Sequence, residues 1–146
     1  MPLTFARRIL SRMALIKWSV KYQTGVDEVD TQHQQIVIYI NELDDVIQAG
    51  SSQDAVAGIL SRLTDYAKYH FTFEEGLLED LGYADLETHR ERHQEFIELI
   101  EGMVEDVDNG KNTIGDMLMV FLKNWLAKHI LIDDMHALSA PNRLLG

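Results

Sequence analysis

The fold is decided by residues 67–96, which read AKYHFTFEEGLLEDLGYADLETHRERHQEF. An apolar stripe at helical spacing runs up to Leu81, Gly82 interrupts it, and a second helical pattern begins near Asp85. A connection this short favours an antiparallel pair of helices. Each helix carries two potential metal ligands four residues apart, a spacing that places both on one helix face. These pairs are His70 with Glu74 and His89 with His93.

Helical patterns on both sides of this hairpin predict an all-α fold, an up-down-up-down antiparallel four-helix bundle. The expected helices run from about Thr31 to Ala49, from Ser52 to Asp80, from Asp85 to Asn109, and from a Thr113-x-x-Asp116 start through His129. Gly50, Gly82 and Gly110 are expected to end the first three. Asp30 or Thr31 is expected to cap the first. No alternating strand pattern is present in the sequence.

The chain is expected to form one domain with a short addition at each end. Residues 1–14 are a basic extension with one weak apolar face, either a frayed tail or an anchor for an anionic surface or partner. Residues 15–138 form the bundle, which opens with an extended arm at residues 15–29. Residues 139–146 form a C-terminal tail.

Composition excludes several classes of function. The 146 residues include 13 basic and 24 acidic side chains, for a formal charge of -11, and no cysteine. Without cysteine there can be no disulfide, zinc–thiolate site or iron–sulfur cluster, and a cytoplasmic location is expected. The acidic balance argues against nucleic-acid binding. No apolar run is long enough to predict a membrane span, and the charged outward faces of the helices favour a monomer.

Five of the six histidines converge on one layer of the predicted bundle. In this topology, the starts of the first and third helices lie level with the ends of the second and fourth. His33 begins the first helix and His129 lies toward the end of the fourth, so both are level with the two pairs of the hairpin. Imidazole and carboxylate donors without thiolate suit iron or another first-row transition metal. The candidate ligands are His33, His70, Glu74, His89, His93, His129 and an aspartate that follows it, Asp133 or Asp134.

A count of coordination positions predicts one open position. Two octahedral ions offer twelve positions: five imidazoles fill five, two bridging carboxylates fill four, and a shared oxo or hydroxo group fills two. Such a site suits a small ligand that binds at one metal. The expected neighbours are apolar: Ile36, Phe73, Trp125 and Leu126. Apolar walls provide no acid or base for turnover, which favours reversible binding over catalysis.

Helical geometry leaves the second carboxylate open. Asp133 is four residues after His129 and would share its face in an α-helix, whereas Asp134, five residues on, would be rotated by about 140°. The sixth histidine, His136, matches no ligand position and is expected at the surface.

The ligand pattern resembles the hemerythrin family, and within it the bacterial hemerythrins, over about residues 15–135. The shared pattern reads His … His-Phe-x-x-Glu-Glu … His-x-x-x-His … Trp-Leu-x-x-His-Ile-x-x-x-Asp, and the segment IKWSVKYQTGVDEVDTQHQQ resembles the family's opening arm. The resemblance implies a non-haem di-iron centre that binds dioxygen reversibly, without enzymatic activity. Oxygen storage, delivery to a protein partner, or scavenging would be its role.

The resemblance also implies a role for each ligand. His89, His93 and His129 match the terminal ligands of one iron. His33 and His70 match those of the other iron, which keeps the open position. Glu74 and Asp134 match the carboxylates that bridge the two irons beside the oxo or hydroxo group. The family pattern therefore selects Asp134 over Asp133, and we infer a distorted helix between His129 and Asp134.

Three alternatives remain at this point. A di-iron enzyme could act on peroxide or nitric oxide or as a ferroxidase, but ferritin-like di-iron oxidases use more carboxylates than this histidine-rich set. An oxygen sensor would need an output module, which residues 1–14 could contact. A purely structural bundle would leave the inward-facing His89 and His93 unexplained.

Overall fold

The computed structural model describes residues 14–110 and 116–139. Within these ranges there are helices and no β-strand, and the predicted all-α four-helix bundle is confirmed. The elements in chain order are the 3-10 turn η1 (Val20–Tyr22), α2 (Asp27–Gln48), α3 (Gln53–Asp80), α4 (Leu86–Asp108), α5 (Asp116–Lys128), the π-helix η2 (His129–Asp134) and α6 (Met135–Ala137).

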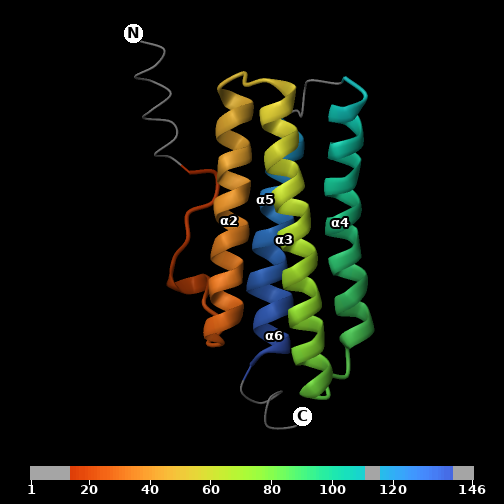
Figure 1. Ribbon diagram of the computed structural model, residues 1–146. Coiled ribbons are helices and arrows are strands. Elements are labelled where there is room, and N and C mark those ends of the chain that lie inside the picture. Colours follow the sequence, from red (N-terminus) through yellow and green to blue (C-terminus); the bar gives the residue numbers. More distant parts are fainter. Residues whose placement is uncertain (1–13, 111–115, 140–146) are drawn as a thin grey trace.

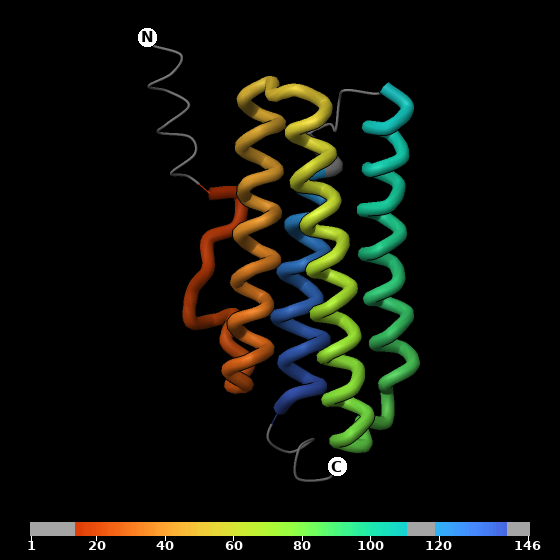
Figure 2. Tube along the Cα trace, in the orientation of Figure 1, coloured from red at the N-terminus to blue at the C-terminus, as the bar shows by residue number. Residues whose placement is uncertain are grey.

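The four long helices run alternately up and down. Figure 1 shows α2 rising, α3 returning beside it, α4 rising again and α5 descending, with η2 and α6 continuing the line of α5. The tube in Figure 2 shows that the junctions after α2 and α3 are short turns at opposite ends of the bundle. Among the described residues, no helix combines the length and apolar character needed to cross a membrane.

Glycine ends α2 and α3 by the same local geometry. Gly50 and Gly82 adopt φ angles of +63° and +69°, which residues with a Cβ rarely adopt. After α2, the amide of Ser51 donates to the carbonyl of Val46, and after α3 the amide of Tyr83 donates to the carbonyl of Leu78. Hydrogen bonds between residues five apart at the end of a helix are typical of a Schellman motif. Gly110 follows α4, which ends at Asp108, and its φ of +81° is also positive, so all three predicted glycine stops are confirmed.

The first long helix begins earlier than predicted. It starts at Asp27 after Val26, and neither Asp30 nor Thr31 caps it. The carboxylate of Asp30 is engaged by the preceding arm instead, accepting hydrogen bonds from the amide and hydroxyl of Thr24 at 2.7 and 2.8 Å. Asp30 thus holds the segment that leads into the helix. Because its carboxylate is occupied by Thr24, it does not serve as the helix cap that we expected.

The other helix starts are close to the predicted ones. Ser52 caps α3, its hydroxyl accepting a hydrogen bond from the amide of Ala55. Asp85 precedes α4 without a side-chain cap. The expected start at Thr113 lies outside the described residues, as do residues 1–13 and 140–146, which make up most of the predicted extension and tail.

The arm lies along α2 (Figure 1) and is held there by two reciprocal hydrogen bonds. The amide of Ile16 donates to Oδ1 of Asn41, and Nδ2 of Asn41 donates to the carbonyl of Ile16, both at 2.9 Å. Further along, the ring of Trp18 stacks on buried Tyr22, with ring centroids 5.3 Å apart. Trp18 also packs against the larger apolar cluster of the bundle, and the arm ends at Val26 rather than at residue 29.

Two apolar clusters of unequal size form the core. The larger cluster includes Ile36, Ala67, Phe96 and Leu126 and fills the body of the bundle. The smaller cluster, at the α3–α4 turn, consists of Val29, Leu78, Ala137 and Leu138, with Phe73, Leu77, Leu81 and Leu86 packed against it. The side chains that lie between the two clusters form a separate layer, which is polar.

Candidate metal centre

The polar layer between the two apolar clusters contains all seven candidate ligands. α2 supplies His33, α3 supplies His70 and Glu74, α4 supplies His89 and His93, and η2 supplies His129 and Asp134. Every one of these side chains is buried, with exposures between 0% and 3%. The structure therefore brings together all of the residues that the sequence singled out, including residues from all four helical columns.

We call these seven side chains the seven-residue cluster. Two carboxylates, those of Glu74 and Asp134, lie at its centre. Oε1 of Glu74 is 2.6 Å from Nε2 of His89, and its Oε2 is 3.3 Å from Nε2 of His70. Oδ1 of Asp134 lies 3.1 Å from Nε2 of His129, and Oδ2 lies 2.9 Å from Nε2 of His33. Each carboxylate therefore contacts histidines on both sides of the cluster.

The donor atoms divide into two overlapping groups, each tight enough to surround one ion. One group comprises Glu74, His89, His93, His129 and Asp134, and the other comprises His33, His70, Glu74 and Asp134. Within each group the donor atoms lie within 4.8 Å of one another. Since the two carboxylates belong to both groups, the geometry fits two neighbouring ions, with three histidines around one and two around the other.

Several donor atoms of the cluster make no hydrogen bond of normal geometry, although most of them lie close to another donor atom, and this observation tests whether a metal fits. They are Nδ1 and Nε2 of His33, Nε2 of His70, Oε2 of Glu74 and both carboxylate oxygens of Asp134. Buried polar atoms left in this way are destabilising, and they are rare in folded proteins. All but one of them point into the cluster toward other donors, so bound cations would satisfy them. The residues present fit a pair of metal ions.

The π-helix η2 explains which aspartate enters the cluster. Its hydrogen bonds join residues five apart, so that Asp134 returns to the face of His129. Asp134 is fully buried, whereas Asp133 lies at the edge with an exposure of 12%. The inferred distortion of the helix is present, and the α-helical reasoning that favoured Asp133 fails because the segment is not α-helical.

Asp133 has a different place, on the outer side of a cluster histidine. Its Oδ2 is 2.9 Å from Nδ1 of His129, the ring nitrogen that faces away from the cluster. Two other histidines have such partners: Nδ1 of His93 lies 2.8 Å from Oε2 of Glu75, and Nδ1 of His70 lies 2.7 Å from Oε1 of Gln32. These outer hydrogen bonds fix each ring so that Nε2 faces the centre.

Sequence reasoning missed these outer partners, and for Gln32 no signal was available. Gln32 and His70 are 38 residues apart and belong to different helices, so no spacing rule links them. Glu75 did carry a signal, since it stands beside Glu74, but the sequence does not indicate that it would bond to a histidine of the next helix.

The charges of the cluster compensate one another. Burial lowers the pKa of His33 and His89, but Asp134 and Glu74 outweigh it and raise both values to about 9. The same competition, led by the charge of Asp134, raises the pKa of His129 to about 10. Burial would raise the pKa of Glu74, yet the surrounding imidazoles hold it well below its usual range. His70 differs, because burial prevails and lowers its pKa.

Aromatic rings cover the three-histidine side of the cluster. Phe71 stacks on His93 with a centroid separation of 3.9 Å, and Trp125 stacks on His129 at 4.8 Å. Trp125 was an expected neighbour, and Phe73, another expected one, is half-buried and packs with the smaller apolar cluster. His136 is exposed, as predicted.

The fold and the cluster define a class of protein, the four-helix bundles with a two-metal site inside. The sequence pattern of the hemerythrin HHE cation binding domain matches residues 24–140, and the chain belongs to the hemerythrin family. The recognition made from the ligand pattern is confirmed. Membership supports a di-iron, oxygen-binding protein, in a family whose members are generally not enzymes.

The chain is similar to bacteriohemerythrins along most of its length. It is 38% identical over 122 residues to the bacteriohemerythrin of Pseudomonas aeruginosa, an alignment that covers 84% of this chain and 78% of that one. It is 26% identical over 121 residues to the bacteriohemerythrin of Clostridium acetobutylicum, covering 80% and 94%. A crystal structure of wild-type hemerythrin superposes with a TM-score of 0.78 at 28% identity, covering 87% of this chain and all of that one.

Proposed function

We propose that the protein binds dioxygen reversibly at a di-iron centre, and that it stores, delivers or scavenges oxygen rather than transforming it. Family membership supports the di-iron centre and dioxygen as the ligand. Among the described residues, every group of side chains that could hold a metal ion belongs to the seven-residue cluster. The cluster draws its residues from all four helices of the bundle. A cytoplasmic location and a monomeric state stay predictions.

In this proposal each half of the cluster holds one iron. His89, His93 and His129 would hold one iron, and His33 and His70 would hold the other, where one position would stay free for a ligand. Glu74 and Asp134 would be shared between the two irons. The division of the donor atoms into two groups that share both carboxylates supports these assignments.

The observation that carries reversible binding is the lack of a spare acid or base. Apart from the seven candidate ligands, the buried polar side chains of the described residues are Asp30, Gln32 and Thr64. Asp30 binds the arm, Gln32 orients His70, and the Thr64 hydroxyl donates to the carbonyl of Leu60. Because all three are engaged elsewhere, none is available to pass a proton to a bound ligand, and proton transfer by a positioned side chain is a common part of enzymatic turnover.

The chain's own residues have two further tasks. When bound, two irons supply the electrons that dioxygen takes up and returns. The apolar clusters on both sides of the polar layer exclude water, with Ile36 and Leu126 fully or almost fully buried on one side and Leu78 on the other. Exclusion of water from a charged site suppresses proton leakage and the side reactions that end reversible binding.

The test is an absorption spectrum of iron-loaded protein through repeated cycles of air and argon. We expect near-ultraviolet and visible bands that appear with oxygen and disappear on its removal over several cycles, with no net consumption of oxygen. Bands that never reverse, in protein shown to contain two irons, would contradict the proposal. Sustained consumption of added peroxide under the same conditions would favour the enzyme instead.

A further inference from the structure

The outer nitrogens of three cluster histidines have partners of different charge. His93 and His129, which belong to the three-histidine group, bond to the carboxylates of Glu75 and Asp133. His70, in the two-histidine group, bonds to the neutral amide oxygen of Gln32. The two halves of the cluster therefore share their central carboxylates but differ in the charge immediately behind their imidazoles.

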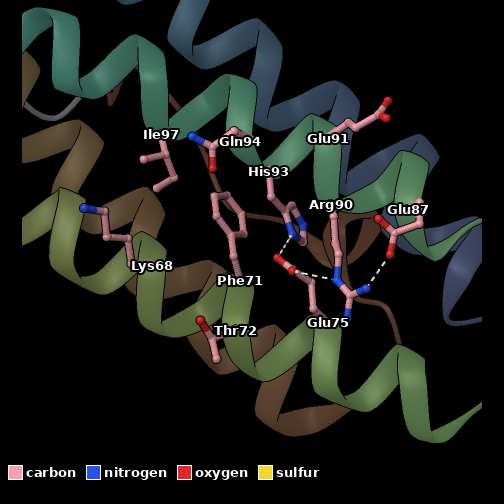
Figure 3. Close-up of a pocket in the computed structure, with 10 residues that line it drawn as sticks. All are labelled: Lys68, Phe71, Thr72, Glu75, Glu87, Arg90, Glu91, His93, Gln94 and Ile97. Carbon is pink, nitrogen blue, oxygen red and sulfur yellow. Dashed lines mark hydrogen bonds and ion pairs between the residues drawn. The ribbon is translucent and has the colours of Figure 1, made fainter.

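Each of the two outer carboxylates is in turn held by an arginine. Figure 3 shows Glu75 between His93 and Arg90, at the edge of a surface cavity of about 490 Å³. Oε1 of Glu75 lies 3.2 Å from Nε of Arg90, while its Oε2 faces the imidazole at 2.8 Å. Arg90 also binds Glu87 on the exposed side. The carboxylate is thus fixed by one oxygen and directs the other at the histidine.

The same arrangement recurs behind His129. Oδ1 of Asp133 lies 2.5 Å from Nη1 of Arg92, and Oδ2 faces Nδ1 of His129 at 2.9 Å. Arg90 and Arg92 both come from α4, but the carboxylates they hold come from different helices, α3 and η2. Two independent arginine–carboxylate–histidine chains therefore end on the same half of the cluster.

An anionic acceptor behind an imidazole makes the ring a stronger donor to a metal on its other nitrogen. A stronger, more electron-rich donor stabilises the ferric over the ferrous state, because the higher positive charge gains more from it. A neutral amide orients the ring but adds no charge. The difference should therefore appear as a difference in oxidation preference between the two halves.

We propose that Glu75 and Asp133 are positioning residues that make His93 and His129 stronger donors and thereby favour ferric iron in the three-histidine half of the site. Gln32 fixes His70 without this effect, which leaves the half with the open position easier to keep ferrous. This inference rests on the proposed function for the presence of two irons, but not on reversible oxygen binding.

The test is the reduction potential of the iron-loaded protein, followed by its absorption under argon, in variants that keep shape and remove charge. Glu75→Gln and Asp133→Asn should each favour the ferrous state at least tenfold, a rise of about 59 mV for a one-electron couple. Gln32→Glu adds the missing carboxylate behind His70 and should shift the potential in the opposite direction. Iron content measured on the same samples shows whether the site is intact.

Matched controls separate this effect from a change of surface charge. Glu87→Gln removes the same charge from a side chain that binds Arg90 and is largely exposed, and it should leave the potential unchanged. Arg92→Gln leaves Asp133 in place without its cation, so the potential should fall. This arginine variant decides the matter if Asp133→Asn loses its iron.

Equal potentials in wild type, Glu75→Gln and Asp133→Asn, with iron retained, would overturn the inference, and so would an unchanged potential in Arg92→Gln. Failure of the proposed function looks different. In that case the potentials would shift as described while the oxygen-dependent bands of the wild type fail to reverse.

Discussion

His129 and Asp134 are five residues apart, yet Nε2 of His129 lies 3.1 Å from Oδ1 of Asp134 inside the cluster. An α-helix would point the two side chains about 140° apart. The π-helix between them places both side chains on one face of the helix. Short π-helical segments of this kind are frequent at functional sites. Local backbone geometry therefore selects one of two adjacent aspartates for the interior.

This selection predicts opposite outcomes for the neighbouring aspartates. Asp134→Ala removes the carboxylate shared by both halves of the cluster, and we expect it to abolish binding of at least one iron. Asp133→Ala leaves the shared donors in place and removes an outer hydrogen bond to His129 together with the ion pair to Arg92, and a loss of about 10–100-fold in metal affinity is typical for an outer partner. Iron content at saturating ferrous iron measures the difference. Equal iron loss in both variants would contradict the selection.

Loss of one histidine should be equally specific. His93→Ala removes a donor of the three-histidine group, and we expect fewer than two irons per chain. His136→Ala changes an exposed histidine outside the cluster and should retain the full iron content. Elemental analysis of the two variants after identical loading provides the comparison, and full iron retention in His93→Ala would exclude this residue from the site.

The metal-free protein should lose stability as the pH rises. The pKa values of His33, His89 and His129 are raised to about 9, 9 and 10, against about 6.5 in an unfolded chain. A raised pKa contributes stability that is fully present below the unfolded pKa and is lost as the pH rises through the folded one. The melting temperature of metal-free protein should therefore fall between about pH 6.5 and 10.

Two features of the cluster set the control for this pH dependence. The pKa values of Glu74 and Asp134 are depressed, so these carboxylates affect stability in acid: their contribution is lost as the pH falls below about 4. Iron binds imidazole in its neutral form and releases the protons, so the iron-loaded protein should show little of the alkaline decline. A decline of the same size with and without iron would contradict these assignments.

The arm should contribute to stability without affecting the metal. Asn41→Ala deletes both hydrogen bonds to Ile16 and leaves two backbone groups without partners, a loss of about 1–3 kcal/mol. Hydrogen exchange at the amide of Ile16 should accelerate while iron content stays the same. Asn124→Ala, at an exposed position of α5, is the matched control and should change neither quantity. Unchanged exchange at Ile16 would show that the arm is held by other contacts.

Helical period and glycine stops were sufficient to predict the bundle, because each stop adopts a positive φ and each apolar stripe faces the core. The ligands were predictable for a similar reason. Pairs such as His89 and His93 repeat at helical spacing, and antiparallel packing brings the pairs level. The family pattern supplied Asp134, since spacing alone favoured Asp133.

What the sequence could not provide depends on contacts between helices. Nothing local indicates that Gln32 bonds to His70 or that Arg92 holds Asp133, because each pair joins residues 38 or more positions apart. The early start of α2 has another cause. Asp30 has the chemistry of a cap, and only the path of the arm shows that its carboxylate is used by Thr24 instead.

Anomalous diffraction at the iron absorption edge, from crystals of iron-loaded protein, tests the central claim most directly. We expect two peaks inside the bundle, one among His89, His93 and His129 and the other beside His33 and His70, with Glu74 and Asp134 in contact with both. A single peak, or peaks only at the protein surface, would contradict the two-iron site on which the function depends.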